Sequence, residues 1–266
     1  MEGSLVISPV IILAAFAFCL LFVLIRGFQC SPYNTRQTMI AWVNVCLTRI
    51  LWRVQVDGQL PAKSERGGII VCNHRGSVDP CFIQLGAHRI VHWFVAREFF
   101  SIPVVGALLR ITGSIPANRA GIDTASTKAA IRMARAGEWI GMLPEGRINQ
   151  TEALLLPGRP GAALVALKAQ VPVVPCYLEG IEYDGTFWGC LFTPGRVKLT
   201  IGEPIELDAY FGREREPAVL GELTLLFLKR IAELAGRPDF EPQLAGRRWS
   251  PITDREDAQL ACESTL

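Results

Sequence analysis

A histidine and an aspartate separated by four residues are the first candidates for acid–base chemistry in this sequence. They lie in the stretch IIVCNHRGSVDP, residues 69–80, where a run of β-branched residues ends at the dipeptide NH. Residues five apart on a helix lie about 140° apart around its axis, because a turn takes about 3.6 residues. His74 and Asp79 can therefore meet only through a turn, which Gly76 and Ser77 can supply. Asp79 could then accept a hydrogen bond from one imidazole nitrogen and leave the other to take a proton from a substrate hydroxyl.

The same two residues also have a purely structural interpretation. Asp79 precedes Pro80, and an aspartate before a proline is a favoured helix N-cap, because it accepts a backbone N–H and proline fits the first helical position. A single histidine in a loop is common. The chain contains no G-x-S-x-G motif, so a serine acyl-enzyme has no support in the sequence. Residue types and spacing leave a general base and a capped helix open as alternatives.

The elements around this pair alternate between strand-like and helix-like segments. Apolar and β-branched runs predict strands at residues 67–72, 91–96, 139–144, 171–180 and 196–202. Helical patterns lie at residues 79–87, 103–111, 123–136, 158–170 and 218–236, and an extended loop is expected at 113–119. This alternation predicts an α/β layered domain with a mostly parallel central sheet flanked by helices.

The predicted sheet also suggests a partner for the histidine. His74 directly follows the strand at 67–72, and Glu145 directly follows the strand at 139–144. Ligands of such sheets bind in the crevice beyond the carboxyl ends of the strands. If these two strands are neighbours, both side chains face the same crevice.

Four motif blocks in this chain resemble, in order, those of the glycerolipid acyltransferases typified by lysophosphatidic acid acyltransferase (1-acyl-sn-glycerol-3-phosphate acyltransferase). They are NHRGSVD (73–79), which fits N-H-x-x-x-x-D; GSIPANR (113–119), with Arg119 at the matching arginine; LPEGRIN (143–149), usually F-P-E-G-T-R-S; and VPVVPC (171–176). The resemblance runs over roughly residues 40–205. One block would be weak evidence, whereas four in order are specific.

The resemblance implies a role for each matching residue. His74 would be the general base that deprotonates an acceptor hydroxyl, and Asp79 would orient it. The resulting oxygen would attack an acyl thioester directly, without a covalent enzyme intermediate. The substrate-binding residues implied in the same way are Asn73, Arg119, Glu145, Gly146 and Arg147. An arginine suits a phosphate, because its planar guanidinium donates two parallel hydrogen bonds. No metal and no bound cofactor are implied; acyl-CoA or acyl carrier protein would be the acyl donor.

The third block departs from the family pattern. The family has a threonine between the glycine and the arginine, whereas here Arg147 follows Gly146 directly and Ile148 comes next. Arg147 either serves as the arginine of the block from a shifted position or does not. The acceptor can therefore be lysophosphatidic acid or another lyso-lipid. A catalytically silent lipid-binding relative and a thioester hydrolase are the alternatives from other functional classes.

A membrane segment is expected at the N-terminus. Residues 5–25 carry no charge, and about 20 apolar residues span a bilayer core as a helix. A cleaved signal peptide would carry positive charge before this run, where only Glu2 is found. Arginines follow the run, at positions 26, 36, 49 and 53. By the positive-inside rule, residues 1–35 would anchor the chain in the inner (cytoplasmic) membrane, spanning or re-entrant, with the catalytic domain facing the cytoplasm.

Three further regions follow this anchor. Residues 36–60 are expected to form an amphipathic helix and a linker, with an apolar stripe made of Ile40, Val43, Leu47, Ile50 and Leu51. The stripe fits a helix at a bilayer interface and a core-packing helix equally well. Residues 61–236 would form the catalytic domain. The polar, proline-rich tail at 237–266 is expected to be poorly ordered.

Composition narrows the partners. The net charge is +2 and basic residues are scattered, which gives no electrostatic argument for nucleic acid. Eight cysteines without a C-x-x-C pair indicate reduced thiols rather than a disulfide framework or a zinc site. Half of the residues are hydrophobic. The expected partners are membrane lipids, a lysophospholipid acceptor and the acyl donor.

Overall fold

The chain divides into two compact units, residues 1–43 and 44–266. A computed structural model describes residues 31, 33–61, 66–118, 124–180 and 193–246. The described part of the first unit is the start of helix α2 (Thr35–Ile50). Asn34 caps this helix: its side chain accepts the N–H of Gln37 at 3.0 Å, and the Gln37 side chain accepts the N–H of Asn34 at 3.2 Å. This reciprocal pair is a capping box, which explains where the helix begins.

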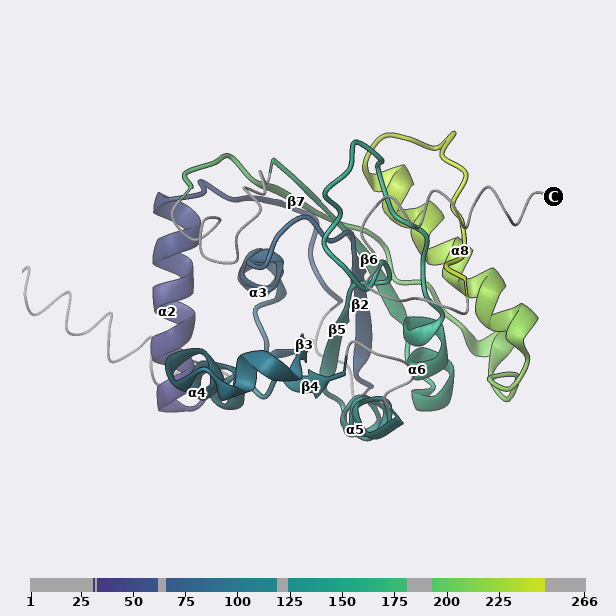
Figure 1. Cartoon of the computed structure of the whole chain (residues 1–266), viewed down its shortest axis with the longest axis horizontal. Coiled ribbons are helices and arrows are strands. Elements are labelled where there is room, and N and C mark those ends of the chain that lie inside the picture. The colour runs from purple at the N-terminus through teal and green to yellow at the C-terminus, as the bar shows by residue number, and fades with distance from the viewer. Residues whose placement is uncertain (1–30, 32, 62–65, 119–123, 181–192, 247–266) are drawn as a thin grey trace, which may run out of the picture. The chain divides into compact units, whose positions relative to one another are not determined.

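The second unit is built on one seven-stranded sheet with the order β1-β7-β6-β2-β5-β3-β4 (Figure 1). The strands are β1 (Gln55–Asp57), β2 (Gly68–Cys72), β3 (Val91–Ala96), β4 (Ile115–Ala117), β5 (Trp139–Met142), β6 (Val173–Glu179) and β7 (Lys198–Ile201). All neighbouring strands are parallel except β6 and β7. The predicted α/β fold with a mostly parallel sheet is confirmed.

Helices cover both faces of this sheet. They are α3 (Asp79–Ala87), α4 (Pro103–Ile111), α5 (Thr124–Arg135), α6 (Gly161–Ala169) and α8 (Pro217–Leu234), with short 3₁₀ turns η1 (Arg97–Ser101) and η2 (Asp208–Tyr210). Figure 1 shows α3 on one side of the strands and α6 and α8 on the other. Proline opens α3, α4 and α8, where its missing N–H costs no helical hydrogen bond.

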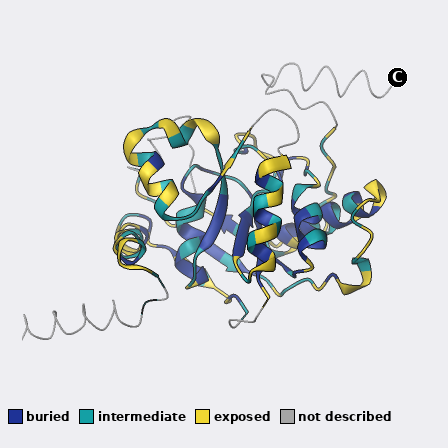
Figure 2. Cartoon of the chain, turned by 90° about the horizontal axis from the view of Figure 1, so that it is seen from below, coloured by how far each residue is buried: buried dark blue, intermediate teal, exposed yellow. Residues whose placement is uncertain are grey.

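Successive side chains of β2 point to opposite faces of the sheet and pack in two separate hydrophobic cores. Ile69 and Val71 lie in the core under α5, α6 and α8, whereas Ile70 and Cys72 lie in the core under α3. Both faces of the central strands are therefore buried, as Figure 2 shows in dark blue. This explains why β2 is uniformly apolar instead of alternating between apolar and polar residues.

Two short strands and part of the tail differ from expectation. Residues 115–117, expected to be a loop, form β4 beside β3, and β1 pairs with β7. A three-residue strand has no periodicity of its own and is defined by its partner. The tail is ordered at least through residue 246, because the N–H of Gly158 donates to Gln243 O at 2.8 Å and the N–H of Ala245 donates to Gly158 O at 2.9 Å. Residues 247–266 lie outside the described residues.

The predicted membrane anchor at residues 5–25 lies outside the described residues. Among the residues described, no helix is both long enough and apolar enough to cross a membrane. Two members of the predicted apolar stripe, Leu47 and Ile50, are 42% and 77% exposed. These two side chains do not pack into a core, and their contact with a bilayer stays a prediction.

Candidate active site

The candidate site lies where β2 and β5 end side by side. The two strands are parallel neighbours, with Val71 opposite Met142, so the loops that follow them leave the same edge of the sheet. The N–H of His74 donates to Glu145 Oε1 at 2.7 Å. The sequence left open whether these two strands are neighbours; the structure shows that they are, and their pairing brings together residues 71 positions apart.

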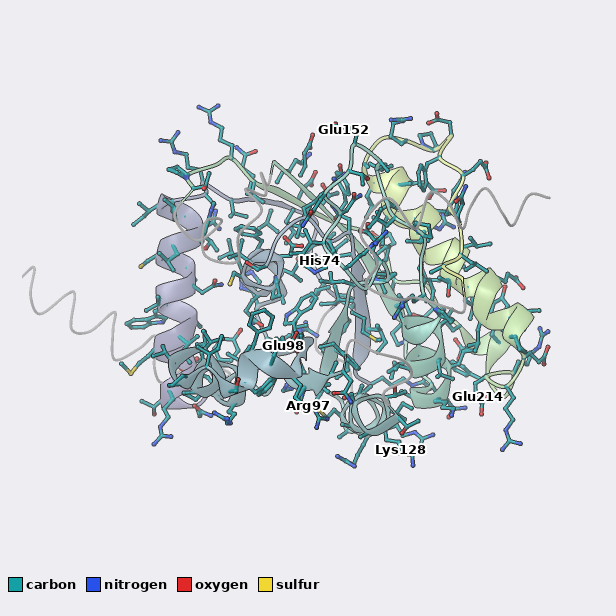
Figure 3. All side chains as sticks on the ribbon, viewed as in Figure 1. His74, Arg97, Glu98, Lys128, Glu152 and Glu214 are labelled. Carbon is teal, nitrogen blue, oxygen red and sulfur yellow. The ribbon has the colours of Figure 1, made fainter. Side chains whose placement is uncertain are left out.

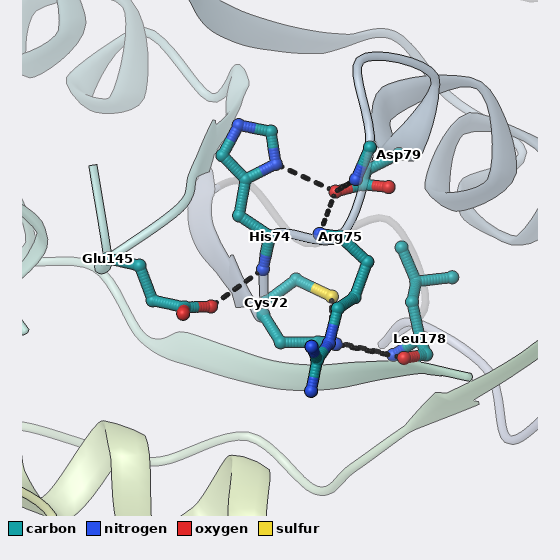
Figure 4. A network of polar contacts seen from close by, with 8 residues as sticks. Cys72, His74, Arg75, Asp79, Glu145 and Leu178 are labelled. Atoms are coloured by element: carbon teal, nitrogen blue, oxygen red, sulfur yellow. Dashed lines mark hydrogen bonds and ion pairs between the residues drawn. The ribbon is translucent and has the colours of Figure 1, made fainter. Parts of the chain in front are cut away.

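His74 and Asp79 are in direct contact. His74 Nδ1 lies 2.8 Å from Asp79 Oδ2 (Figure 4). The aspartate is fully buried, and the histidine side chain is 17% exposed. An ionised carboxylate can only accept, so the proton of a neutral imidazole lies on Nδ1 and Nε2 is the basic nitrogen. Within the described residues, Nε2 makes no hydrogen bond, so it is free to meet a substrate hydroxyl.

Asp79 does not cap the helix as expected. Helix α3 begins with Asp79 itself, Val78 is the N-cap residue, and no side chain caps this end. The carboxylate instead turns back to the preceding loop, where Oδ2 accepts the N–H groups of Arg75 at 2.8 Å and Gly76 at 3.0 Å. Three donors, counting His74, thus hold one oxygen. This anchoring fixes the orientation of the imidazole without a helix cap.

The buried Glu145 side chain connects the loop that follows β2 with the loop that follows β5. Its side chain is buried, with the residue only 2% exposed. Oε1 accepts the N–H of His74, and Oε2 accepts the N–H of Leu156 at 2.8 Å. Burial raises the pKa of Glu145 to about 7, although the two N–H groups act in the opposite direction. Both carboxylate oxygens of Glu145 therefore accept hydrogen bonds from backbone N–H groups. Within the third block, LPEGRIN, Gly146 is exposed whereas Glu145 is buried.

Asn73 plays a similar part on the other side of β2. It is fully buried. Its side-chain amide donates to Leu178 O and accepts the N–H of Leu178, both at 2.8 Å. These two bonds extend the pairing of β2 with β6 by one step and hold His74 at a fixed position beyond the strand. The amide is therefore occupied by the backbone of β6.

Arg75 is a residue that sequence reasoning missed. Its guanidinium donates to the backbone oxygens of Thr151, Ala153 and Leu154, at 3.2, 3.0 and 3.2 Å. The N–H of Asn149 also donates to the oxygen of His74 at 2.8 Å. Together these bonds clamp the loop after β5 onto the His74 segment. Arg75 stands between the two predicted catalytic residues, but nothing in its local sequence indicates partners 76 to 79 positions away.

Two arginines gather at the third block. Arg147 follows the exposed Gly146 and is half-buried. The Arg159 side chain lies over the same glycine: a Cβ added to Gly146 would lie 3.1 Å from Arg159 Cδ. The backbone N–H of Arg159 donates to Pro144 O at 2.9 Å. Partial burial and the nearby charge of Arg147 lower the pKa of Arg159. The loop therefore carries a local excess of positive charge. Arg119 lies outside the described residues.

No metal cluster is found in the described part of the chain, where no group of three or more His, Cys, Asp or Glu residues could hold an ion. Four cysteines fall in that part, at positions 46, 72, 81 and 176, and all are free thiols. His74 and Asp79 supply an oriented imidazole, and the loop after β5 supplies the guanidinium groups of Arg147 and Arg159. This arrangement can remove a proton from a hydroxyl while holding an anionic ligand.

The raised pKa of Glu145 predicts a pH dependence of stability. Between pH 4.5, the ordinary value, and about 7 the folded protein retains a proton that the unfolded chain has released. The free energy of unfolding therefore falls as pH rises through this window. The expected loss from pH 5 to pH 8 is about 2 to 3 kcal/mol, at ~1.4 kcal/mol per pKa unit. The measurement is urea unfolding at both pH values for wild type and Glu145→Gln, and the variant should lack this part of the slope.

Glu152 provides the matched control for this measurement. It belongs to the same loop but is exposed, and Figure 3 shows it at the outer rim, away from His74. Glu152→Gln should keep the wild-type dependence on pH. Equal pH slopes for wild type and Glu145→Gln would contradict the prediction.

The sequence matches a known family across the site just described. The Acyltransferase family matches residues 53–179, a range that contains His74, Asp79, Glu145 and Arg159. The 1-acyl-sn-glycerol-3-phosphate acyltransferase of Bacillus subtilis is 29% identical over 181 residues, covering 68% of this chain and 86% of that protein. The human 1-acyl-sn-glycerol-3-phosphate acyltransferase beta is 29% identical over 157 residues, covering 58% and 56%.

A solved structure has a similar fold. The crystal structure of the 1-acyl-sn-glycerophosphate acyltransferase PlsC from Thermotoga maritima superimposes with a TM-score of 0.59 at 23% identity. The similarity covers 88% of this chain and 90% of that one. The similarity in fold therefore extends beyond residues 53–179, which match the family, to most of the layered architecture.

Proposed function

Because the chain belongs to the family of lysophosphatidic acid acyltransferase-like enzymes, we propose that it acylates the free hydroxyl of lysophosphatidic acid (1-acyl-sn-glycerol 3-phosphate). The acyl donor would be acyl-CoA or acyl carrier protein, and the product would enter phospholipid biosynthesis. The observation that carries this proposal is the 2.8 Å contact of His74 with a buried, anchored Asp79. It leaves a basic nitrogen at the crevice of an acyltransferase domain.

The proposed reaction is a direct transfer. His74 Nε2 removes the proton of the acceptor hydroxyl while the oxygen attacks the carbonyl carbon of the thioester. The carbon–oxygen bond forms, the carbon–sulfur bond breaks, and the departing thiolate takes the proton from the imidazolium. Asp79 stabilises the imidazolium between these two steps by accepting the hydrogen bond of Nδ1. No residue is acylated on the way.

Positive charge in the third block supports an acceptor with a phosphate. Arg159 lies over Gly146 and feels the charge of Arg147, and Glu145 links the start of this loop to His74. A phosphomonoester held by these guanidiniums would sit near the base. In this proposal Arg159 contributes the charge that the family supplies from the position where this chain has Ile148.

Arg159→Gln tests the contact with the phosphate. It should lower kcat/KM for lysophosphatidic acid about tenfold or more, because a hydrogen bond to a charged group contributes about 1.5 to 3 kcal/mol. The value for monoacylglycerol, which lacks the phosphate, should change less. Arg237→Gln is the control, since Arg237 is exposed at the end of α8. The same loss with both acceptors would contradict phosphate recognition by Arg159.

The acceptor and the product are lipids, which places the protein at a membrane in this proposal. The exposed Leu47 and Ile50 would face the lipid surface, and the catalytic domain would lie on the cytoplasmic side of the inner membrane. The anchor predicted at residues 5–25 would add to this attachment. Phospholipid vesicles therefore belong in every assay of the full chain.

The proposal as a whole is tested by mass spectrometry of lipids. The full chain in membranes is incubated with several lysolipids and with labelled acyl-CoA or acyl carrier protein. Labelled phosphatidic acid is the expected product. Loss of thioester without any acylated lipid would identify a hydrolase instead, and binding of lysolipid without turnover would identify a silent relative.

A further inference from the structure

A basic hollow opens at the same edge of the sheet as His74. Strand β7 runs antiparallel to β6, so β7 starts where β2 and β6 end, and β1, parallel to β7, starts there too. A hollow of about 560 Å³ lies among these strand ends. Its charged lining residues are Arg53, Glu179, Arg196 and Lys198. Another hollow, of about 340 Å³, lies at the opposite edge of the sheet.

The hollow carries an excess of positive charge. It gathers three cations, Arg53, Arg196 and Lys198, around one carboxylate, Glu179. Lys198 also lies 3.5 Å from Asp57, so the three cations face two carboxylates in and beside the hollow, which leaves a net charge of +1. Three cations in one concave surface repel one another and attract a polyanion. Three basic side chains on one concave surface can donate to an anionic ligand at more than one point.

The backbone below the hollow is held firmly. Arg53 has φ +44°, a left-handed conformation that is uncommon outside glycine. Two bonds bracket it: the N–H of Val197 donates to Trp52 O at 3.1 Å, and the N–H of Gln55 donates to Val197 O at 2.9 Å. Strained backbone that its surroundings hold in place is frequent at ligand sites. Arg53 and Arg196 are thus presented from fixed positions.

The hollow lies within reach of the base. The Asn73 side chain bonds both backbone groups of Leu178, the residue before Glu179. Adjacent strands are about 4.8 Å apart, so β7 lies about 10 Å from β2 and β1 about 14 Å. A pantetheine arm has the length of about four extended residues, or about 14 Å at ~3.4 Å per residue. A thioester at one end could meet His74 while phosphates at the other end occupy the hollow.

We infer that this hollow binds the phosphates at the nucleotide end of acyl-CoA, which makes acyl-CoA the donor for the acyl transfer proposed above. Its size falls in the range of small-molecule pockets, about 300 to 1,000 Å³. A carrier protein would need a contact surface of roughly 800 Å² on each partner, far more than four charged residues provide. The inference rests on the proposed function and adds the place where its donor binds.

Two variants and a truncated donor test the site. Arg53→Gln and Arg196→Gln are compared with wild type, using palmitoyl-CoA and S-palmitoyl-pantetheine, which lacks the nucleotide. The ratio of kcat/KM for the CoA donor to that for the pantetheine donor should fall about tenfold in each variant, since each loses one charged hydrogen bond. Arg132→Gln, which removes an exposed arginine of α5, should keep the wild-type ratio. An unchanged ratio in both test variants would overturn the inference.

Direct binding separates this inference from the proposed function. Adenosine 3′,5′-bisphosphate is titrated calorimetrically into the full chain, a measurement that needs no turnover. Binding to wild type that weakens about tenfold in each variant supports the hollow, even if lysophosphatidic acid is not the acceptor. No binding to wild type, or equal binding to all proteins, overturns the hollow, even if acyl transfer from acyl carrier protein is found.

Discussion

His74→Asn is expected to lower kcat for acyl transfer by about 10²- to 10⁴-fold, the usual contribution of a general base. The asparagine amide nitrogen takes nearly the place of imidazole Nδ1, so it can still donate to Asp79 Oδ2, which His74 approaches to 2.8 Å. It has no nitrogen that can accept a proton at the position of Nε2. KM for both substrates should change little, because the asparagine side chain abolishes proton transfer but keeps the hydrogen bond to Asp79 and so leaves the surrounding loop in place.

The control for this variant is His88→Asn. His88 is exposed and follows α3 with φ +50°, a conformation that asparagine adopts readily. This variant should retain wild-type kcat in the same vesicle assay. Near-normal transfer by His74→Asn, with a melting temperature equal to that of wild type, would remove His74 from the proposed mechanism.

Asp79→Asn is expected to have an effect of similar size for a different reason. The N–H groups of Arg75 and Gly76 hold an oxygen at the Oδ2 position, so the asparagine amide oxygen can still accept the hydrogen bond of Nδ1. His74 would keep its orientation, but the positive charge that develops on the imidazole during proton transfer would lose its counter-charge. We expect kcat to fall by about 10²- to 10⁴-fold.

Nitrogen NMR of the imidazole distinguishes this role from a structural one. In wild type and in Asp79→Asn the Nδ1–H signal should report the hydrogen bond to the oxygen at the Oδ2 position, whereas kcat should fall only in the variant. Asp239→Asn, at an exposed carboxylate beside Arg237, is the control and should change neither the tautomer nor kcat. Full activity of Asp79→Asn with an unchanged Nδ1–H signal would rule out stabilisation of the imidazolium by the charge of Asp79.

Much of the layered fold was predictable from the sequence. The long elements carry their own signals: an apolar run for β2, a proline at the start of α3 and the strongly apolar α8. The two three-residue strands, β1 and β4, carry no such signal, because a short extended segment becomes a strand only when a partner is beside it. The antiparallel placement of β7 was likewise absent from the local pattern.

In the candidate site, too, the local contacts were easier to predict from the sequence than the contacts that depend on the path of the loops. The turn that lets His74 meet Asp79 lies within six consecutive residues, so residue types and spacing made the contact possible, and the resemblance of the motif blocks favoured it. The anchoring of Asp79 was not predictable, since its carboxylate turns to Arg75 and Gly76 N–H groups where the local pattern favoured a helix cap. The path of the loop places all three donors on Oδ2, while Oδ1 is buried without a hydrogen-bond partner among the described residues.

The sequence by itself determined that His74 and Asp79 can meet through a turn, the strand–helix alternation and the motif blocks, because each of these depends on neighbours within a few residues. Only the tertiary structure decided that Glu145 and Arg75 clamp the loop after β5, and that Arg53 and Arg196 meet beyond β6. These contacts join segments about 70 to 140 positions apart along the chain. Their geometry follows from strand order and register, which depend on how the whole sheet packs between its helices.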